Sequence, residues 1–405
     1  MKVVQINATC DAGSTGRICR ELNDALLQYG NEGLVLYGNG KSDYQHARKV
    51  SGNAEVKAHG LMSRILGKNA AYSPAATGKI LDILETWQPD LVHLHNFHGN
   101  YVNLKPLLRY LAANDIPTVL TLHDCWLFTG KCTHYTEAGC HKWQTGCGCC
   151  SRLKEDIPSY FFDRTAEMWG EKKALFQAIP RLAVIGVSDW ITREAQKSFL
   201  KDAAMLQRIY NWINPEVFYP RGPEARREFG ISENKYAVLC AGVAWDRDST
   251  KTKDLLALAA ILPEDCEIIL AGAIAFSGRL PGNIKSVGYL SSAEDLAKLY
   301  SACDIYVHLS REDTFGKVIA EAIACGTPAV VYDSTACPEI VGADCGYVVP
   351  VGDVASIWEA IQKTRNGERT AWEQSCVQHA RDDFSKEKRI AQTLELYQKL
   401  LQKEV

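Results

Sequence analysis

Residues 304–331 read DIYVHLSREDTFGKVIAEAIACGTPAVV and contain one complete strand–loop–helix–strand unit. Residues 304–309 and 328–332 are short apolar runs, typical of strands that are covered on both faces in a parallel sheet. Between them, a polar loop leads into a helical pattern over residues 316–325. Two parallel strands joined by a helix are the repeating unit of an α/β sheet, so this segment predicts that fold class.

The same alternation extends over almost the whole 405-residue chain. Strands are expected at residues 2–6, 33–37, 90–95, 117–122, 181–187, 236–242, 266–271, 304–309 and 328–332. Helical patterns occupy residues 15–30, 74–87, 104–114, 164–178, 252–262, 292–302, 316–325 and 353–365. Because nine strands and 405 residues fit two doubly wound sheets better than one, we predict two α/β domains.

The domain boundary is expected after the first five strands. Residues 211–220 read NWINPEVFYP, which looks like an interdomain segment, and a second α/β series restarts at Tyr236. We therefore predict an N-terminal domain over residues 1–208 and a C-terminal domain over residues 209–385. The last helix, about residues 386–405, could pack on either domain, and we favour the N-terminal one.

Composition and charge narrow the class of protein. The formal charge is 45 − 48 = −3, with 46% hydrophobic residues, so the chain lacks the basic excess that is usual for nucleic-acid binders. It contains no apolar stretch of about 18 residues, so no membrane-spanning helix is expected. The N-terminal residues are too polar for a signal peptide, and we therefore expect a cytoplasmic protein with reduced cysteines.

Open parallel sheets bind ligands beyond the carboxyl ends of their strands, so the residues at these ends are the candidate site. Gly13 and Gly16 follow the first strand, where glycines before a helix suit either a phosphate site or a plain turn. The third strand is followed by His95 and Asn96, and the fourth by His123, Asp124 and Trp126. Histidines clustered at strand ends indicate binding or catalysis, and a polar tie between loops is the alternative.

Acidic and basic residues follow the strand ends in the second half of the chain. Asp313 lies in a loop, and Gly316 then opens a helix whose free N–H groups suit a diphosphate. Glu321 lies on an apolar helical segment, where a buried carboxylate needs donors such as sugar hydroxyls. Arg247 and Lys251 would neutralise charge on a departing nucleotide. A capped helix and an exposed polar loop are the alternatives.

The block from Ser310 to Val331 resembles the E-x-F-G-x-x-x-x-E-A-x-A-x-G-x-P-V-V motif of the retaining, GT-B-type glycosyltransferases of family four, also called glycosyltransferase group one. Asp313 stands where the family has its first Glu, and Glu321 matches the second. Lys251 matches the lysine of the family's donor-phosphate loop, with Thr252 in place of the usual glycine. The segments HLHN at 93–96 and HDCWLFTGKC at 123–132 are similar to the colanic-acid and exopolysaccharide biosynthesis branch.

This resemblance implies two Rossmann-like domains that face each other across a cleft. It also implies retaining transfer from a nucleotide-sugar donor, UDP- or GDP-linked, to a glycan or lipid-linked acceptor in bacterial surface-polysaccharide biosynthesis, without a catalytic cofactor. The catalytic residues it implies are His123, Asp313 and Glu321. The donor-binding residues are Gly13, Gly16, Arg247, Lys251, Thr314, Phe315, Gly316 and Lys317, and the acceptor-side residues are His95, Asn96, Asp124 and Trp126. A nucleotide-sugar epimerase of the same fold and a non-catalytic cysteine-cluster binding module are the alternative functions.

Six of the 15 cysteines fall within residues 125–150, which we interpret as a Cys-rich insert. Four of them, Cys132, Cys140, Cys147 and Cys150, offer thiols at a spacing that suits a structural Zn²⁺. Cys149 could substitute for Cys150, and disulfides or free thiols are the alternatives to a metal. The aromatic residues Trp126, Tyr135 and Trp143 could stack on a sugar or form a small local core, and we favour the core.

A lipid-linked acceptor would bring the protein to a membrane surface. Residues 57–72 mix basic side chains with Leu61, Met62, Ile65 and Leu66. Such a basic amphipathic stretch can lie on an anionic membrane. An ordinary surface helix is the alternative, and from the sequence alone it is the one we favour.

Overall fold

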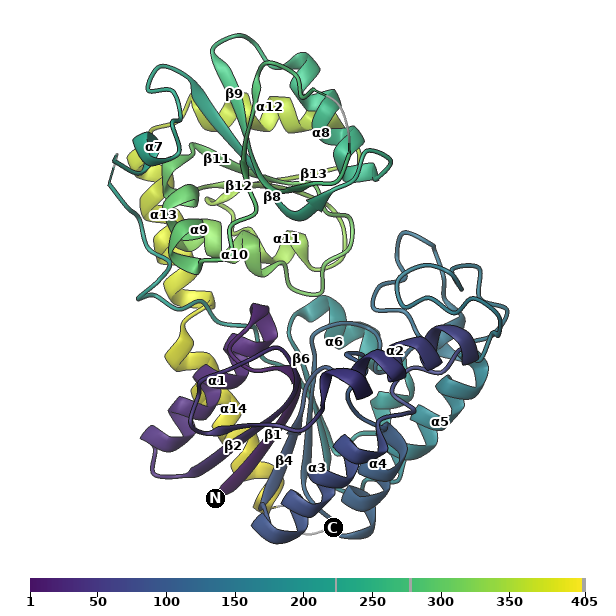
Figure 1. Cartoon of the computed structure of the whole chain (residues 1–405). Coiled ribbons are helices and arrows are strands. Elements are labelled where there is room, and N and C mark those ends of the chain that lie inside the picture. The colour runs from purple at the N-terminus through teal and green to yellow at the C-terminus, as the bar shows by residue number, and fades with distance from the viewer. Residues whose placement is uncertain (223, 277–278, 403–405) are drawn as a thin grey trace. The chain divides into compact units, whose positions relative to one another are not determined.

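The computed structural model describes residues 1–222, 224–276 and 279–402, and the chain divides into two compact units (Figure 1). Unit 1 comprises Met1–Ile209 together with the C-terminal segment that begins at Ile390, and unit 2 comprises Tyr210–Arg389. Each unit is built around one parallel sheet with helices on both of its faces. The chain therefore leaves unit 1 after residue 209 and returns to it near its C-terminal end.

The sheet of unit 1 has seven strands in the order β3-β2-β1-β4-β5-β6-β7. The strands are β1 (Lys2–Thr9), β2 (Glu32–Asn39), β3 (Ala47–Lys49), β4 (Leu91–Leu94), β5 (Thr118–Leu122), β6 (Leu182–Gly186) and β7 (Met205–Arg208). β1 is central, and its buried Val4 lies opposite Leu34 of β2 and Val92 of β4. The strand order reverses between β1 and β4, which makes the carboxyl ends of these two strands a ligand-binding position in folds of this type.

The helices of unit 1 cover this sheet with apolar stripes. They are α1 (Gly13–Gln28), α2 (Asn53–Leu66), α3 (Pro74–Trp87), α4 (Leu104–Ala113), α5 (Thr165–Gln177) and α6 (Asp189–Gln196), with the 3-10 turns η1 (Lys142–Gln144) and η2 (Phe199–Asp202). In α1, Ile18, Leu22 and Leu26 recur every four residues and are all buried, as expected for a helix that packs on a sheet. The part of α14 (Lys386–Gln402) after residue 390 also belongs to this unit and buries Leu396, Tyr397 and Leu400.

The sheet of unit 2 has six strands in the order β10-β9-β8-β11-β12-β13. The strands are β8 (Tyr236–Trp245), β9 (Cys266–Ile274), β10 (Ile284–Gly288), β11 (Ile305–His308), β12 (Ala329–Tyr332) and β13 (Gly346–Val349). Its helices are α7 (Glu224–Glu228), α8 (Thr250–Ile261), α9 (Ala293–Ala302), α10 (Lys317–Ala324), α11 (Cys337–Ile340), α12 (Val354–Arg365) and α13 (Arg369–Asp383). The strand order reverses between β8 and β11, so the loops that follow these two strands occupy the same kind of position as those after β1 and β4.

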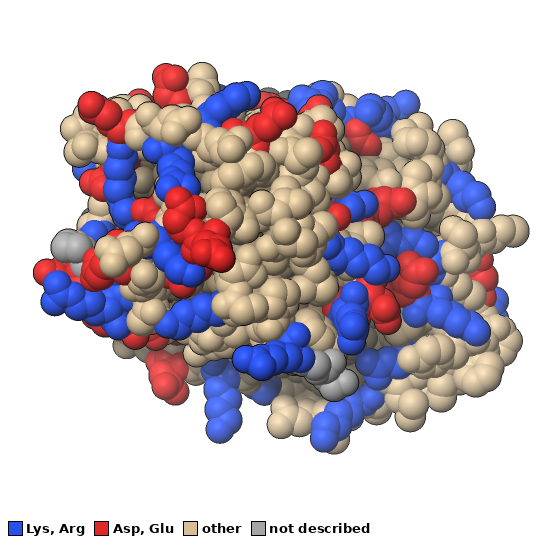
Figure 2. Space-filling view, turned by 90° about the horizontal axis from the view of Figure 1, so that it is seen from above, with Lys and Arg blue, Asp and Glu red and all other residues tan. Residues whose placement is uncertain are grey.

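All nine expected strands are present, and the α/β prediction is confirmed. The four strands that the sequence did not predict, β3, β7, β10 and β13, are the outermost strands of the two sheets. Within the described residues, no helix combines the length and the apolar character needed to cross a bilayer. On the face shown in Figure 2, basic and acidic side chains are intermixed.

Candidate functional site

Three histidines gather at the carboxyl end of the sheet in unit 1. His95 directly follows β4 and His123 directly follows β5, and because these strands are parallel neighbours the two side chains meet. His95 Nδ1 lies 3.0 Å from His123 Nε2, and their rings stack with centroids 5.3 Å apart. The ring of His93 also stacks on that of His95, with centroids 4.1 Å apart. The structure therefore brings two sequence-predicted site residues, His95 and His123, into direct contact.

The tautomers of this histidine chain follow from Gln5, a buried polar residue of β1. Gln5 Nε2 donates to the carbonyl oxygen of Cys19, at 3.0 Å, so Gln5 Oε1 is left to accept from His95 Nε2 at 3.2 Å. A neutral His95 then has no proton on Nδ1, and His123 must donate through Nε2. It follows that a neutral His123 carries no proton on Nδ1 and can act there only as a hydrogen-bond acceptor.

Burial keeps His93 and His95, the two histidines that support His123, neutral. It lowers the pKa of His93 to about 3 and that of His95 well below its usual value, with a smaller contribution from the neighbouring imidazoles. The two ring nitrogens of His93 are also used, because Nδ1 lies 2.5 Å from Tyr397 Oη and Nε2 lies 2.7 Å from Thr121 Oγ1. The result is an uncharged, hydrogen-bonded support beneath His123.

Asp124 ties the loop after β5 to the loop after β4. His98 Nε2 lies 2.8 Å from Asp124 Oδ2, and the Trp126 N–H donates to Asp124 Oδ1 at 2.8 Å. Burial alone would raise the pKa of Asp124, but the hydrogen bond and the charge of His98 outweigh it and hold that pKa below its usual value. Asn96 is held in the same region by its backbone N–H, which donates to Asn7 Oδ1 at 3.2 Å.

Trp126 is buried below this loop. The Lys172 ammonium lies 3.9 Å from the centre of its indole ring, and the ring lines a cavity of about 290 Å³ in unit 1. Trp126, Tyr135 and Trp143 are all buried, as the local-core interpretation expects. Tyr135 and Trp143 pack on each other, with ring centroids 4.9 Å apart.

The two glycines after β1 have different structural roles. Gly13 begins α1 with a φ of +68°, a left-handed conformation that favours glycine, and a Cβ there would meet nothing within 4 Å. Gly16 lies within the first turn of α1, and a Cβ there would come within 2.9 Å of Thr9 Oγ1. Gly13 thus leaves open space at the helix start, whereas Gly16 allows close packing of α1 on the end of β1.

In unit 2, Asp313 lies in the loop between β11 and α10 and is oriented from two sides. His308 Nε2 lies 2.7 Å from Asp313 Oδ2, and Tyr306 Oη lies 2.8 Å from His308 Nδ1. The backbone N–H of Asp313 donates to Thr335 Oγ1 at 2.9 Å. The Asp313 carboxylate is therefore the last member of a series of hydrogen-bonding contacts that begins at Tyr306 in the buried strand β11.

Lys251 and Arg247 follow β8 but have different surroundings. Lys251 lies in the first turn of α8, partly buried, 5.2 Å from the centre of the Trp245 ring. Burial lowers its pKa, and the charge of Asp313 opposes that shift, so the two charged groups lie within electrostatic range. Arg247 is exposed in the preceding turn. The structure thus relates Lys251 to the loop that carries Asp313.

The helix after Asp313 starts as the motif expects. Gly316 is the N-cap of α10 with a φ of +75°, and no side chain caps the helix. Thr314 and Phe315 are buried, and the Phe315 ring packs against Phe384 with centroids 5.6 Å apart, which makes it an anchor of the loop. Lys317 is partly buried in the first turn, and Glu321 is 2% exposed in the middle of the helix.

Gln5, Tyr306 and His308 were not singled out in the sequence, although each supports a predicted site residue. Gln5 interrupts the apolar run of residues 3–6, and His308 interrupts that of residues 305–309. A polar side chain in a strand that is buried on both faces needs a partner, and this was the available signal.

One group of three side chains among the described residues, His308, Asp313 and Cys337, brings possible metal-ligand atoms within 4.8 Å of one another. His308 and Asp313 bond directly to each other there, and burial raises the pKa of Cys337 well above its usual value, so we interpret this group as a hydrogen-bonded support for the loop. No three cysteine sulfurs of the insert lie within 4.8 Å of one another, but four of the cysteines line a common cavity.

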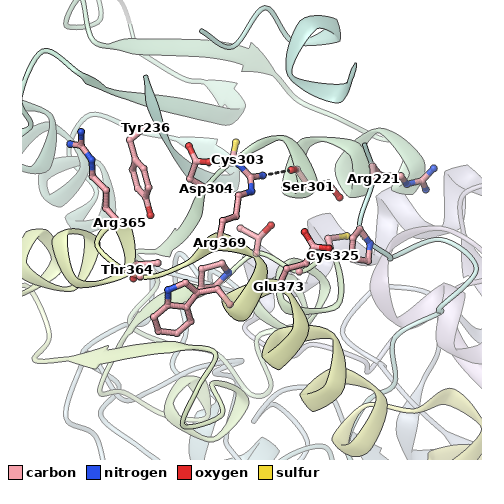
Figure 3. Close-up of a pocket in the computed structure, with 16 residues that line it drawn as sticks. Arg221, Tyr236, Ser301, Cys303, Asp304, Cys325, Thr364, Arg365, Arg369 and Glu373 are labelled. Carbon is pink, nitrogen blue, oxygen red and sulfur yellow. Dashed lines mark hydrogen bonds and ion pairs between the residues drawn. The ribbon is translucent and has the colours of Figure 1, made fainter. Parts of the chain in front are cut away.

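A separate pocket of about 70 Å³ lies at the other end of the strands in unit 2, near the amino ends of β8, β11 and β12 (Figure 3). Three arginines in its wall, Arg221, Arg365 and Arg369, form ion pairs with Glu294, Asp265 and Asp304. These arginines are already paired, and ligands of parallel sheets bind at the carboxyl ends of the strands and not at the amino ends. We therefore interpret this pocket as part of the scaffold and not as a donor site.

Comparison with known proteins gives two family models that together cover most of the chain. The model described as Glycosyltransferase Family 4 matches residues 15–217, and the model described as Glycosyl transferases group 1 matches residues 224–383. A putative colanic acid biosynthesis glycosyl transferase of Escherichia coli K12 is 25% identical over 382 residues, which are 88% of this chain and 89% of that protein.

Solved structures show the same fold. A sucrose-phosphate synthase from Thermosynechococcus elongatus aligns with a TM-score of 0.67 at 17% identity, covering 98% of each chain. The Anabaena protein HepE, in complex with UDP and glucose, aligns with a TM-score of 0.65 at 18% identity, covering 98% of this chain and 100% of that one. Two parallel α/β units with these neighbours have the GT-B architecture.

Proposed function

The chain belongs to glycosyltransferase family 4, and we propose that it transfers a sugar from a nucleotide diphosphate sugar to a glycan or lipid-linked acceptor of a bacterial surface polysaccharide. Both matching models describe glycosyltransferases, which favours transfer over epimerisation or a purely binding role. The similarity to the Escherichia coli colanic acid protein along most of both chains supports the polysaccharide class.

The arrangement around Asp313 is the observation that carries the donor assignment. A carboxylate fixed by His308 precedes the uncapped start of α10, and the ammonium of Lys251 lies within electrostatic range of it. Helix N–H groups and a lysine suit the diphosphate, while a fixed carboxylate suits sugar hydroxyls. The proposal therefore assigns donor binding to unit 2 and acceptor binding, with His123, to unit 1.

We include retention of anomeric configuration in the proposal, on the strength of the family resemblance. The bond from the anomeric carbon to the phosphate oxygen breaks, and the bond to the acceptor oxygen forms on the same face. The acceptor proton passes to the leaving phosphate, whose charge Lys251 and the start of α10 stabilise. Proton NMR of the first-formed product tests this step, because an inverted anomer would contradict it.

A donor panel tests the proposed function directly. The protein is incubated with UDP, GDP, ADP or CMP, and thermal unfolding is measured. A nucleotide at 100 times its Kd adds about 2.7 kcal/mol to stability, which moves the melting temperature by a few degrees. We expect a selective rise with UDP or GDP, followed by sugar transfer from the corresponding sugar nucleotide. A folded sample that responds to none of the four would contradict the donor site.

Lys251→Met and Arg247→Met form a matched pair for this experiment. Both remove one positive charge from the region after β8, but Lys251 is partly buried within electrostatic range of Asp313, whereas Arg247 is exposed. We expect Lys251→Met to lower kcat by about 100-fold or more, as when a group that stabilises a developing charge is lost, and Arg247→Met to have a much smaller effect. Equal losses in the two variants would contradict the assignment of Lys251.

We also propose that the protein acts at the cytoplasmic face of a membrane and contacts anionic lipid through unit 1. The end of α2 exposes four apolar side chains, Leu61, Met62, Ile65 and Leu66, and the nearby segment 160–162 exposes Tyr160, Phe161 and Phe162. The two segments adjoin, since the Tyr160 N–H donates to the Arg64 carbonyl oxygen at 2.8 Å. The exposed side chains of Lys57 and Arg64 belong to the same helix, and a basic apolar surface of this kind suits an anionic bilayer.

Vesicle co-sedimentation tests the membrane contact. We expect binding to vesicles that contain phosphatidylglycerol, weaker binding to neutral vesicles, and loss of binding in Ile65→Ser/Phe161→Ser. Tyr289→Ser is the control, because Tyr289 is a similarly exposed aromatic residue in unit 2. Binding that is unchanged in the double variant would contradict the proposed surface.

A further inference from the structure

We propose that the loop between β5 and α5 holds one Zn²⁺ through the thiolates of Cys132, Cys140, Cys147 and Cys150. This site is separate from the donor and acceptor residues and goes beyond the proposed transfer reaction. All four cysteines are unpaired and line one cavity of about 40 Å³, which has room for a single ion. Four thiols that line one cavity favour Zn²⁺, which prefers tetrahedral thiolate sites.

The structure selects these four thiols from the six in the insert. Cys125 is fully buried and does not line the cavity. Cys149, the alternative to Cys150, is exposed and also lies outside the cavity wall. Its φ of +46° places it in a left-handed turn between its neighbours. Cys150 therefore completes the set and Cys149 does not.

Buried positive charge near the cavity points independently to an anionic centre. Lys131 and Lys172 are 4% and 2% exposed. Lys131 Nζ donates to the carbonyl oxygens of Glu155 and Ile157, and Lys172 Nζ donates to that of Trp126, so both bond to neutral groups. Lys131 lies within electrostatic range of Cys132 and Cys150, and Lys172 of Cys147. Lys172 also lies within electrostatic range of the Asp124 carboxylate. A zinc ion with four thiolates carries two negative charges, which are favourable beside Lys131 and Lys172.

The backbone around the cavity supports the same assignment. The Gly130 N–H donates to Cys147 Sγ at 3.2 Å, an interaction that stabilises a thiolate. Lys142 Nζ donates to the carbonyl oxygens of Gly148 and Cys149, at 3.1 and 2.9 Å, and so fixes the turn that leads to Cys150. These contacts orient two of the four ligands before any ion is present.

The length of the loop is a further observation that suits a crosslink. Residues 123–164 contain no regular element except the three-residue turn η1, and loops of this length inside compact domains are uncommon unless they are functional or otherwise constrained. The small core around Tyr135 and Trp143 orders one side of it. Because no three of these four Sγ atoms lie within 4.8 Å of one another, metal binding would have to draw the cysteines together and would tighten the loop.

Metal content is the first test. The purified full-length protein is analysed by inductively coupled plasma mass spectrometry. We expect about one zinc per chain, and loss of most of it in Cys132→Ser, Cys140→Ser, Cys147→Ser or Cys150→Ser. Cys149→Ser is the matched control, one residue from a ligand, and should retain the full amount. A wild-type protein without zinc that cannot be reconstituted, or equal loss in Cys149→Ser, would overturn the proposal.

A second measurement keeps the proposal testable if a ligand variant fails to fold. The wild-type protein is stripped with a chelator under reducing conditions and titrated with Co²⁺. Tetrahedral thiolate coordination should give intense visible bands that saturate at about one equivalent, and the metal should slow proteolysis within residues 123–164. Bands typical of octahedral coordination, or disulfides among these cysteines in protein alkylated before lysis, would overturn it. Nucleotide binding by unit 2 is measured separately, so failure of the zinc site is distinguishable from failure of the proposed function.

Discussion

His123 donates a hydrogen bond from Nε2 to Nδ1 of His95, over 3.0 Å, and the direction of this bond is set by Gln5 at the far side of His95. Because the amide group of Gln5 is fixed by the Cys19 carbonyl, its oxygen faces His95. The neutral His123 then has an unprotonated Nδ1, which can only accept a hydrogen bond. His95 is thus a positioning residue for His123.

Replacing His95 should affect turnover more than donor affinity. In His95→Leu the Nε2–H of His123 loses its acceptor, and the loss of one such bond corresponds to about a tenfold lower kcat. The donor KM should change little, because we assign the donor to unit 2. His95→Gln restores an acceptor oxygen and should recover part of the rate. A rise in donor KM with unchanged kcat, or no recovery in His95→Gln, would argue against this role.

His308 should influence donor binding through Asp313. In His308→Phe the carboxylate of Asp313 loses its 2.7 Å partner, and we expect the donor KM to rise by about tenfold. Steady-state kinetics with varied sugar nucleotide measure this change. The stability of the variant is followed in parallel by thermal unfolding.

Tyr306→Phe is the graded control for this experiment. It removes only the more distant bond, from the tyrosine hydroxyl to His308 Nδ1, and leaves the contact between His308 and Asp313 in place. Its effect on the donor KM should therefore be smaller than that of His308→Phe. If Tyr306→Phe has the larger effect, the hydrogen bonds of Tyr306 and His308 do not influence donor binding through Asp313.

Unit 1 should lose stability in mild acid. Burial lowers the pKa of His59 to about 4 and that of His93 to about 3, and it holds the pKa of His95 well below its usual value. Because these folded-state values lie below the unfolded value of about 6.5, the stabilisation is complete above pH 6.5 and declines as the pH falls towards 4 and 3. Each histidine contributes a slope of up to about 1.4 kcal/mol per pH unit. Thermal unfolding at pH 7.5, 6 and 5 measures this decline in stability.

A variant tests which groups cause this acid sensitivity. His59→Gln removes one buried titrating group and should reduce the difference in melting temperature between pH 7.5 and pH 5. His46→Gln, at a partly exposed position, should leave that difference unchanged. An equal effect of the two variants would mean that the buried histidines are not responsible.

The sequence predicted the inner strands because they are largely apolar, and it missed the outermost strands of the two sheets. β7 reads MLQR and β10 reads IKSVG, and each pairs on one side only, so polar residues are tolerated there. The donor loop could be located because glycine and acid stand at fixed positions before a helix. The residues that support the site could not be located in this way. The hydrogen bonds between Gln5 and His95 and between Tyr397 and His93 join residues that are 90 and 304 positions apart.

The last prediction concerns Asp304, which connects three elements of unit 2. Its carboxylate accepts from Arg226 Nη1 at 3.1 Å and from the Ala237 N–H at 2.7 Å. It also accepts from Arg369, which lies in the wall of the same pocket (Figure 3). Asp304→Asn removes the negative charge between two arginines, one of them nearly buried, and should cost about 3 kcal/mol in the free energy of unfolding. Asp265→Asn breaks the exposed pair with Arg365 and should change stability far less. Urea unfolding of the two variants measures this contrast. Since Asp304 lies at the amino ends of the strands, nucleotide binding by folded Asp304→Asn should be retained. Loss of nucleotide binding would show that the amino and carboxyl ends of the strands are coupled.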